Sequence, residues 1–355
     1  MKNQHGNGDK SIDLSIISKY RNEVFGISII SIMIFHFVEN VVKSNRTDFI
    51  SDISKLYNIT VSSVGVEMFL FLSGMGLFFS MKKNDNIKQF YSKRFKRILI
   101  PYTILGAMFW VIRDVVILHS GGLRFIHDFI LISFWTNGRR TFWFISFILI
   151  MYLIFPLLFK LLDTKVNHRG ITFIILLTAT IGGSELIKLF FPDVYNNIEV
   201  ALCRIPIFLF GIYIGGKIYN HEPFGILEKI IVPFGLAARL MSMTIYYTDI
   251  PVKNVFQGRF GTCIFALSLV IMLPIILDKL NCNTLNKILR KVGSYSFELY
   301  MTHVAIRNIM NLCDYSTYII HHYLICIVFS IVLSILLHKL TEKLTQGNKS
   351  NKISQ

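Results

Sequence analysis

Long apolar runs recur along the whole chain, and they restrict the possible fold more than any other feature. A bilayer's hydrocarbon core of about 30 Å requires roughly 20 consecutive apolar residues in a helix. Runs of this length recur from Phe25 to Leu340, and 53% of the 355 residues are hydrophobic. The sequence therefore predicts an all-α, polytopic bundle of membrane helices.

The runs predict about ten membrane-spanning helices. Their expected bounds are 25–42, 62–81, 98–118, 142–162, 171–191, 202–220, 224–247, 259–278, 293–313 and 317–340. The expected organisation is a short N-terminal segment, one membrane domain and a tail, at 1–20, 21–340 and 341–355. An even number of spans places both termini on the same side of the membrane.

Basic residues are concentrated in the loops on one side. The loop after the second predicted helix contains Lys82, Lys83, Lys88, Lys93, Arg94, Lys96 and Arg97 against Asp85 alone. The opposite loops, such as 43–61 and 192–201, are mixed or mildly acidic. The positive-inside rule therefore predicts that both termini are cytoplasmic. The same rule accounts for the formal charge of +16, so we expect the lipid bilayer and no nucleic acid as a partner.

The five cysteines have neither CxxC spacing nor a Cys/His ligand pattern. Such spacing is what would indicate a metal site or a disulfide framework. We therefore expect packing thiols and no metal. The sequence gives no indication of the oligomeric state.

His36 lies inside the first apolar run. An ionisable side chain costs a few kcal/mol inside a bilayer, so it marks a functional site by default. Arg21 lies fifteen residues earlier, a rotation of about 60°, so both side chains can face one groove at different depths. The alternatives are a structural histidine bonded to a neighbouring helix and an arginine that anchors the helix at the interface.

The second run contains Glu67 at a depth similar to that of His36. A buried carboxylate needs a cationic partner or must be protonated. We therefore predict that Glu67 pairs with His36. Ser73 and Gly74 follow, and small residues of this kind indicate close packing of two helices.

Arg94 and Arg97 lie three residues apart after the second run, on one face of a helical turn. Guanidinium groups match phosphate oxygens well, so the pair is a candidate phosphate site. The alternative is ordinary cytoplasmic loop charge.

The fourth and ninth runs add candidates on the outer side. Trp143 opens the fourth predicted helix, where an aromatic belt residue is also expected. The ninth places four polar residues on one stripe, namely Ser296, Tyr300, His303 and Arg307. Two ionisable groups on one stripe favour an orientation toward the bundle interior.

Together these segments resemble the acyltransferase 3 family, integral-membrane O-acyltransferases of surface carbohydrates and some secondary metabolites. The motifs are Arg21 with His36, Gly65-Val66-Glu67-x-Phe69-x-x-Leu72-Ser73-Gly74, Arg94-x-x-Arg97 with Pro101, Trp143-Phe144 with Tyr152 and Pro156, Arg204-x-Pro-x-Phe-x-x-Gly211, and Ser296-x-x-Leu299-Tyr300-x-x-His303. They occur in the family's order over residues 19–340. Two positions differ, since Phe25 stands where the family usually has arginine, and Glu67 where it often has aspartate.

The resemblance implies a multi-pass enzyme of a bacterial-type plasma membrane that takes an acyl group, most commonly acetyl, from cytoplasmic acyl-CoA. The acceptor would be a hydroxyl of a cell-surface carbohydrate or a glycolipid precursor. His36 would act as general base, with Glu67 orienting it. Donor phosphates would bind Arg94, Arg97 and Arg21, and the acceptor side would include Trp143, Tyr300 and His303. The rival interpretations are a glycan transporter, flippase or polymerase, and an inactive sensor or scaffold.

Several arginines are expected in the outer half of the bundle. They are Arg204, Arg239 and Arg307 within predicted spans, and Arg139 and Arg140 at the outer end of the fourth. Arginines inside a span are costly unless an anion or a water-filled cavity receives them. They suggest an acceptor cleft for a negatively charged substrate. The alternative is that they reach lipid headgroups or pair with nearby acids.

Overall fold

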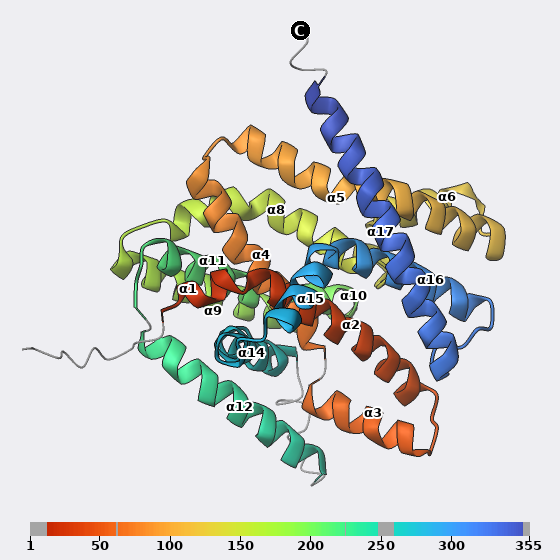
Figure 1. The fold of residues 1–355 in the computed structure, drawn as a ribbon, viewed down its shortest axis with the longest axis horizontal. Helices are drawn as coiled ribbons and strands as arrows, with labels where there is room; N and C mark the ends of the chain where they lie inside the picture. The colour runs from red at the N-terminus through yellow and green to blue at the C-terminus, as the bar shows by residue number, and fades with distance from the viewer. Residues whose placement is uncertain (1–12, 62, 224, 248–258, 351–355) are drawn as a thin grey trace, which may run out of the picture.

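The computed structural model describes residues 13–61, 63–223, 225–247 and 259–350, and within these ranges every regular element is a helix (Figure 1). The helices are α1 Ser15–Lys19, α2 Arg21–Lys43, α3 Phe49–Thr60, α4 Val64–Lys83, α5 Ile87–Trp110, the π-helix η1 Val111–Ile117, α6 Gly121–Phe129, α7 Ile132–Asn137, α8 Trp143–Leu162, α9 Val166–Phe190, α10 Pro192–Leu202, α11 Ile205–Tyr219, α12 Ile226–Tyr247, α14 Arg259–Leu280, α15 Asn283–Ser294, α16 Ser296–Leu312 and α17 Ile320–Ser350. The predicted all-α fold class is confirmed.

Eight helical stretches are long and apolar enough to cross a membrane, judged over the described residues. They are Arg21–Lys43, Phe49–Lys83, Ile87–Ile117, Trp143–Leu162, His168–Phe190, Pro192–Tyr219, Gly261–Leu280 and Ile320–Thr345. The two other predicted spans contain α12 and α16, and α16 has only 17 residues. The chain is a polytopic helical membrane protein. The number of ten crossings and the cytoplasmic termini stay predictions.

Helix α4 forms the centre of the bundle because it is apolar on every side, and a helix of this kind must be surrounded by others. Its Gly74 packs against the backbone of α11, and Gly211 of α11 packs against the carbonyl of Phe71. A side chain at either glycine would collide with the facing backbone. The predicted close packing at Ser73-Gly74 is confirmed, with α11 as the partner.

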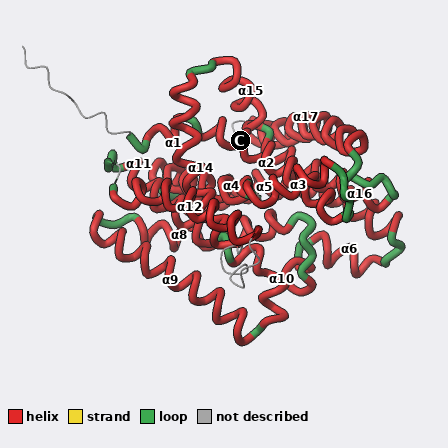
Figure 2. The backbone as a smooth tube through the Cα atoms, turned by 90° about the horizontal axis from the view of Figure 1, so that it is seen from below, coloured by secondary structure: helices red, strands yellow, loops and turns green. Residues whose placement is uncertain are grey.

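The predicted loop 43–61 contains the amphipathic helix α3. Asp48 caps its N-terminus by accepting a hydrogen bond from the backbone N–H of Ser51 at 3.0 Å. The helix lies alongside α2 (Figure 1). At the other end of α2, the short helix α15 packs on its first half, and Figure 2 shows α15 and α9 at opposite edges of the bundle.

Candidate functional site: two cavities at opposite ends of α2

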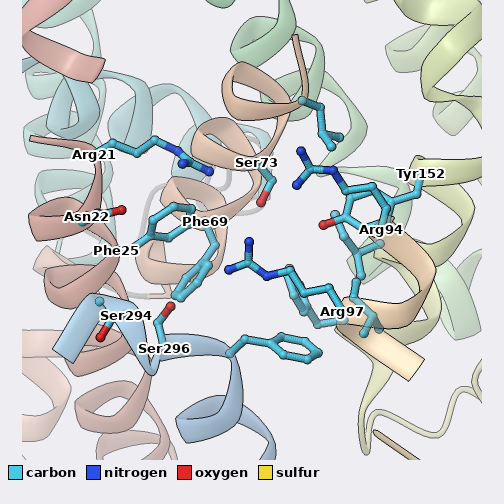
Figure 3. A pocket seen from close by; sticks show the side chains of 16 residues that line it. Arg21, Asn22, Phe25, Phe69, Ser73, Arg94, Arg97, Tyr152, Ser294 and Ser296 are labelled. Atoms are coloured by element: carbon cyan, nitrogen blue, oxygen red, sulfur yellow. The ribbon is translucent and has the colours of Figure 1, made fainter. Parts of the chain in front are cut away.

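A cavity of about 280 Å³ lies beside the start of α2. Three guanidinium groups from two helices, those of Arg21, Arg94 and Arg97, are directed into it, with Ser73 between them (Figure 3). Tyr152 and Ser296 contribute hydroxyl groups to its wall. We call this cavity the Arg21 pocket.

The Arg21 pocket is positively charged and uncompensated. None of the residues that line it is acidic. Among the described residues, Arg21, Arg94 and Arg97 have no carboxylate partner within ion-pair distance. Like charges held together without a counter-ion favour the entry of an anion, and guanidinium groups bind phosphate oxygens in a bidentate manner. The pocket is therefore suited to a phosphorylated ligand.

Arg21 reaches this pocket although it lies one helical turn before the family's usual arginine position. Its guanidinium lies 5.0 Å from the ring centroid of Phe25, the residue that stands at that position. It also lies so close to Gly76 of α4 that a side chain there would collide with it. Phe25 and Gly76 therefore direct the charge of Arg21 into the groove.

A second cavity, of about 350 Å³, lies at the other end of α2 and contains His36. His36 is fifteen residues beyond Arg21, which is about 22 Å along a helix. Trp143 lines the cavity, as do five cationic side chains, namely Lys43, Arg140, Arg204, Arg259 and Arg307. We call this cavity the His36 pocket.

Each cationic side chain that lines the His36 pocket forms an ion pair with a glutamate. Glu199 accepts from Arg140 at 2.8 Å and from Arg259 at 2.7 Å. Glu39 lies 2.7 Å from the ammonium of Lys43 and 3.5 Å from Arg307. The fifth cation, Arg204, lies 2.6 Å from Glu67, and its guanidinium is 5.1 Å from the ring of Trp143.

The His36 imidazole is supported from behind by a second histidine. The rings of His36 and His303 stack with centroids 5.3 Å apart and planes 9° apart. Nε2 of His303 lies 3.2 Å from the hydroxyl of Tyr323, and that hydroxyl also donates to the carbonyl of Met33. Nδ1 of His36 is buried and has no hydrogen-bond partner among the described residues. The stacked His303 ring thus holds the His36 ring in place.

A narrow apolar constriction separates the two pockets. Ile32, Val66 and Tyr300 line it, as do the rings of Phe69, Phe144 and Phe297, around a free volume of only about 10 Å³. Its lining overlaps with the Arg21 pocket at the three phenylalanines and with the His36 pocket at Ile32 and Val66. We call it the neck. The hydroxyl of Tyr300 is buried there without a hydrogen-bond partner in the described chain.

Comparison with protein families adds one match to this geometry. A family model described as an acyltransferase domain matches residues 26–339. The chain belongs to the acyltransferase 3 family. The resemblance predicted from the sequence motifs is confirmed, and the protein is a membrane-embedded acyltransferase. No curated protein and no solved structure gives a significant match.

The predicted pairing of Glu67 with His36 is wrong. In the acyltransferase, the carboxylate of Glu67 is fully buried and lies against Arg204, from the start of α11. The depth of a residue along its helix predicts which layer it occupies but not which neighbour faces it. Since α4 packs most closely on α11, the cation of that helix is the one that Glu67 meets.

The expectation that Arg239 lines the acceptor cleft is also wrong. Its guanidinium donates to the carbonyls of Thr60 at 2.8 Å and Asn58 at 3.2 Å, at the C-terminus of α3. The last carbonyls of a helix lack internal partners, and an arginine satisfies them. Arg239 therefore fixes α3 against α12.

Arg139 and Arg140, adjacent in sequence, have different environments. Arg140 lines the His36 pocket, as expected. Arg139 instead lies 2.9 Å from Asp128 of α6, whose carboxylate is also 3.5 Å from Arg113. Tyr300 lines the neck, and His303 lies behind His36, so both adjoin the His36 pocket without lining it.

Arg259 is a pocket residue that sequence reasoning missed. It opens α14 and enters the His36 pocket beside Glu199. The signal was present, because Arg259 is a cation at the predicted outer end of the eighth span.

Proposed function

We propose that the acyltransferase transfers a short acyl group, with acetyl as the first candidate, from cytoplasmic acyl-CoA to a hydroxyl group of a cell-surface carbohydrate or its lipid-linked precursor. One observation carries the proposal. A phosphate-suited pocket and a pocket containing a histidine occupy opposite ends of α2, and one apolar neck lies between them. A donor on one side of the membrane and an acceptor on the other would meet at this neck.

The donor half of the proposal rests on Arg21, Arg94 and Arg97. CoA carries several phosphate groups, and three unpaired guanidinium groups are suited to hold them. The loop that follows α4 is strongly basic, which supports a cytoplasmic position for this pocket in a bacterial-type plasma membrane. The pantetheine arm would extend from the Arg21 pocket toward the neck.

The chemical step needs a base for the acceptor hydroxyl. His36 would take that proton while the hydroxyl oxygen attacks the thioester carbonyl. The carbon–sulfur bond then breaks, and the departing CoA thiolate takes the proton from His36. Tyr300, with a buried and unpartnered hydroxyl in the neck, would donate a hydrogen bond to the oxyanion that forms in between.

His303 would act as a positioning residue. Its ring stacks on His36, and Tyr323 fixes it in turn. An imidazole held against a fixed ring loses less freedom when it must be aligned with a hydroxyl group. Glu67 would act indirectly, by holding Arg204 against Trp143 in the wall of the His36 pocket.

The test is acceptor-dependent release of free CoA thiol by the purified protein, with acetyl-CoA as donor and an envelope glycan fraction from its own cells as acceptor. We expect thiol release with the glycan and little without it, and label from the acetyl group should appear in the glycan. His36→Ala should abolish both signals, whereas Arg124→Gln, at an exposed arginine of α6, should retain them. Movement of glycan across vesicles without thiol release would instead indicate a transporter.

A further inference from the structure

We propose that the His36 pocket selects an acceptor with a negative charge, carried by a carboxylate or a phosphate group near the hydroxyl that is acylated. The inference rests on the proposed function for the identity of the ligand as acceptor. Its structural basis is the balance of charge around the pocket.

Five cations line the pocket, and their ion-pair partners in the described chain are three carboxylates, Glu39, Glu67 and Glu199. Glu39 and Glu199 are each shared by two cations. The network therefore has two more positive than negative charges. The three more buried arginines, Arg204, Arg259 and Arg307, are matched in number by the three carboxylates. The excess positive charge therefore lies on the more exposed Lys43 and Arg140, where an anion can approach.

Unused donors lie at this site. Nε of Arg204 and Nε of Arg307 are buried and have no hydrogen-bond partner among the described residues. Arg204 as a whole is only 2% exposed, so bulk water does not solvate its charge. Buried donors of this kind cost free energy unless a ligand or a water accepts from them. The oxygens of an anionic group would satisfy them.

The remaining polar lining suits a sugar. Asn40, Asn308 and Asn311 line the same pocket. The amide nitrogens of Asn40 and Asn308 donate within the protein and the amide oxygen of Asn311 accepts there, which leaves the other half of each amide for a ligand. Amides donate and accept, so they match hydroxyl groups, whereas the guanidinium groups match an anion. The lining of the pocket thus includes amide groups that match hydroxyl groups and guanidinium groups that match an anion, together with His36.

Because Glu39 and Glu199 each pair with two cations, some variants can remove one cation without leaving a carboxylate unpaired. Without Arg307, Glu39 keeps Lys43 as its partner, and without Arg140, Glu199 keeps Arg259. Arg307→Gln and Arg140→Gln therefore remove a pocket cation without leaving a buried carboxylate unpaired. Arg204 is unsuitable because Glu67 would lose its partner.

The test measures binding and does not depend on turnover. Detergent-purified protein is saturated with CoA, so that the Arg21 pocket is occupied, and its thermal midpoint is followed while glucuronate, glucose 6-phosphate or glucose is added. A ligand that binds only the folded state raises this midpoint. We expect the two anionic sugars to raise it and glucose to have a much weaker effect. Arg307→Gln and Arg140→Gln should each weaken anionic-sugar binding about tenfold, the loss typical of one charge-assisted hydrogen bond.

Arg124→Gln and Arg97→Gln are the controls, the first for general surface charge and the second for binding at the donor pocket. Both should retain the response to glucuronate. An equal response to glucose, no response to either anionic sugar, or unchanged binding in both pocket variants would overturn the proposal. A response to a short-chain anionic phospholipid alone would also overturn it and assign the charge to a lipid headgroup. Failure of the proposed function would appear separately, as absence of acceptor-dependent thiol release.

Discussion

The Arg21 pocket and the His36 pocket are both rich in arginine but differ in how that charge is compensated. Arg21, Arg94 and Arg97 have no acidic partner in the described chain, whereas every cation of the His36 pocket contacts a carboxylate. An unpaired guanidinium is hydrated when the pocket is empty and can exchange that water for a phosphate. A paired guanidinium is held in a fixed position. Unpaired guanidinium groups suit a ligand that must bind and then be released. Paired guanidinium groups suit a ligand that must be aligned.

The difference extends to how the two pockets should respond to salt. Arg97 is exposed, so its attraction for a phosphate is screened within about 10 Å at 0.1 M salt. Arg204 is buried and paired, so its charge is screened much less. A ligand contact to Arg97 should therefore weaken with ionic strength more steeply than a contact to Arg204.

The largest expected effect is the loss of the base. His36→Ala should lower the rate of acyl transfer by about 10²-fold to 10⁴-fold, the usual contribution of a positioned general base. The measurement is acceptor-dependent thiol release at saturating donor. CoA affinity should be unchanged, because Arg21 lies about 22 Å from His36 along α2.

His303→Gln provides the comparison for this prediction. It removes the ring that stacks on His36 but leaves the base, so we expect a smaller loss that is confined to kcat. A loss of kcat as large as that of His36→Ala would indicate that His303 is the base. Near-normal turnover of His36→Ala would remove His36 from the mechanism.

The second effect concerns stability in the wall of the His36 pocket. Arg204→Met should lower the free energy of unfolding by about 3–5 kcal/mol, because it leaves the carboxylate of Glu67 buried without a partner. Adding Glu67→Gln to the same chain removes that charge and should restore a large part of the loss. The measurement is thermal unfolding in detergent. A double variant as unstable as the single one would mean that the pair is not coupled.

The third effect is on donor affinity. Arg94→Gln and Arg97→Gln should each raise the KM for acyl-CoA about tenfold or more and change kcat little, because a phosphate contact made equally in ground and transition states contributes to binding alone. Excess donor should rescue both variants. A loss of kcat with unchanged donor binding would assign these arginines to the chemical step.

The fold class was predictable from the sequence. Which residues line each pocket was also more predictable than which side chains contact one another. Apolar runs define helices, and position along a helix defines depth in the membrane. Arg21, Arg94 and Arg97 were therefore correctly assigned to one depth, and His36, Arg204 and Arg307 to another. Depth arguments need only the rise per residue, which is the same for every helix.

Lateral neighbours were not predictable in this way, because they depend on how helices pack. Glu67 meets Arg204 since Gly74 and Gly211 bring α4 against α11. Arg239 caps α3, a helix that the mixed composition of 43–61 did not suggest. The neck consists of side chains from four helices, so no single segment of sequence contains its pattern.

The smallest expected effect concerns the neck, where the two pockets meet. In the proposed mechanism the acyl group enters the neck, and a free volume of about 10 Å³ there would favour a short acyl group. Phe297→Leu should widen this point and shift selectivity toward longer acyl groups. We expect the ratio of kcat/KM for acetyl-CoA to that for butyryl-CoA to fall about tenfold, within the range that a few methylene groups contribute in an apolar pocket.

The comparison with Phe190→Leu distinguishes a local effect from a general one. Phe190 is 66% exposed at the end of α9 and does not line the neck. Phe190→Leu makes the same chemical change outside the neck, so it should leave the ratio of the two kcat/KM values unaltered. Phe297 also lines the Arg21 pocket, and a change in CoA binding would alter kcat/KM for both donors equally. The ratio cancels that contribution and reports the neck alone. If the ratio is unchanged in Phe297→Leu while both values fall together, acyl length is not set in the neck, and the two pockets must meet at another point along α2.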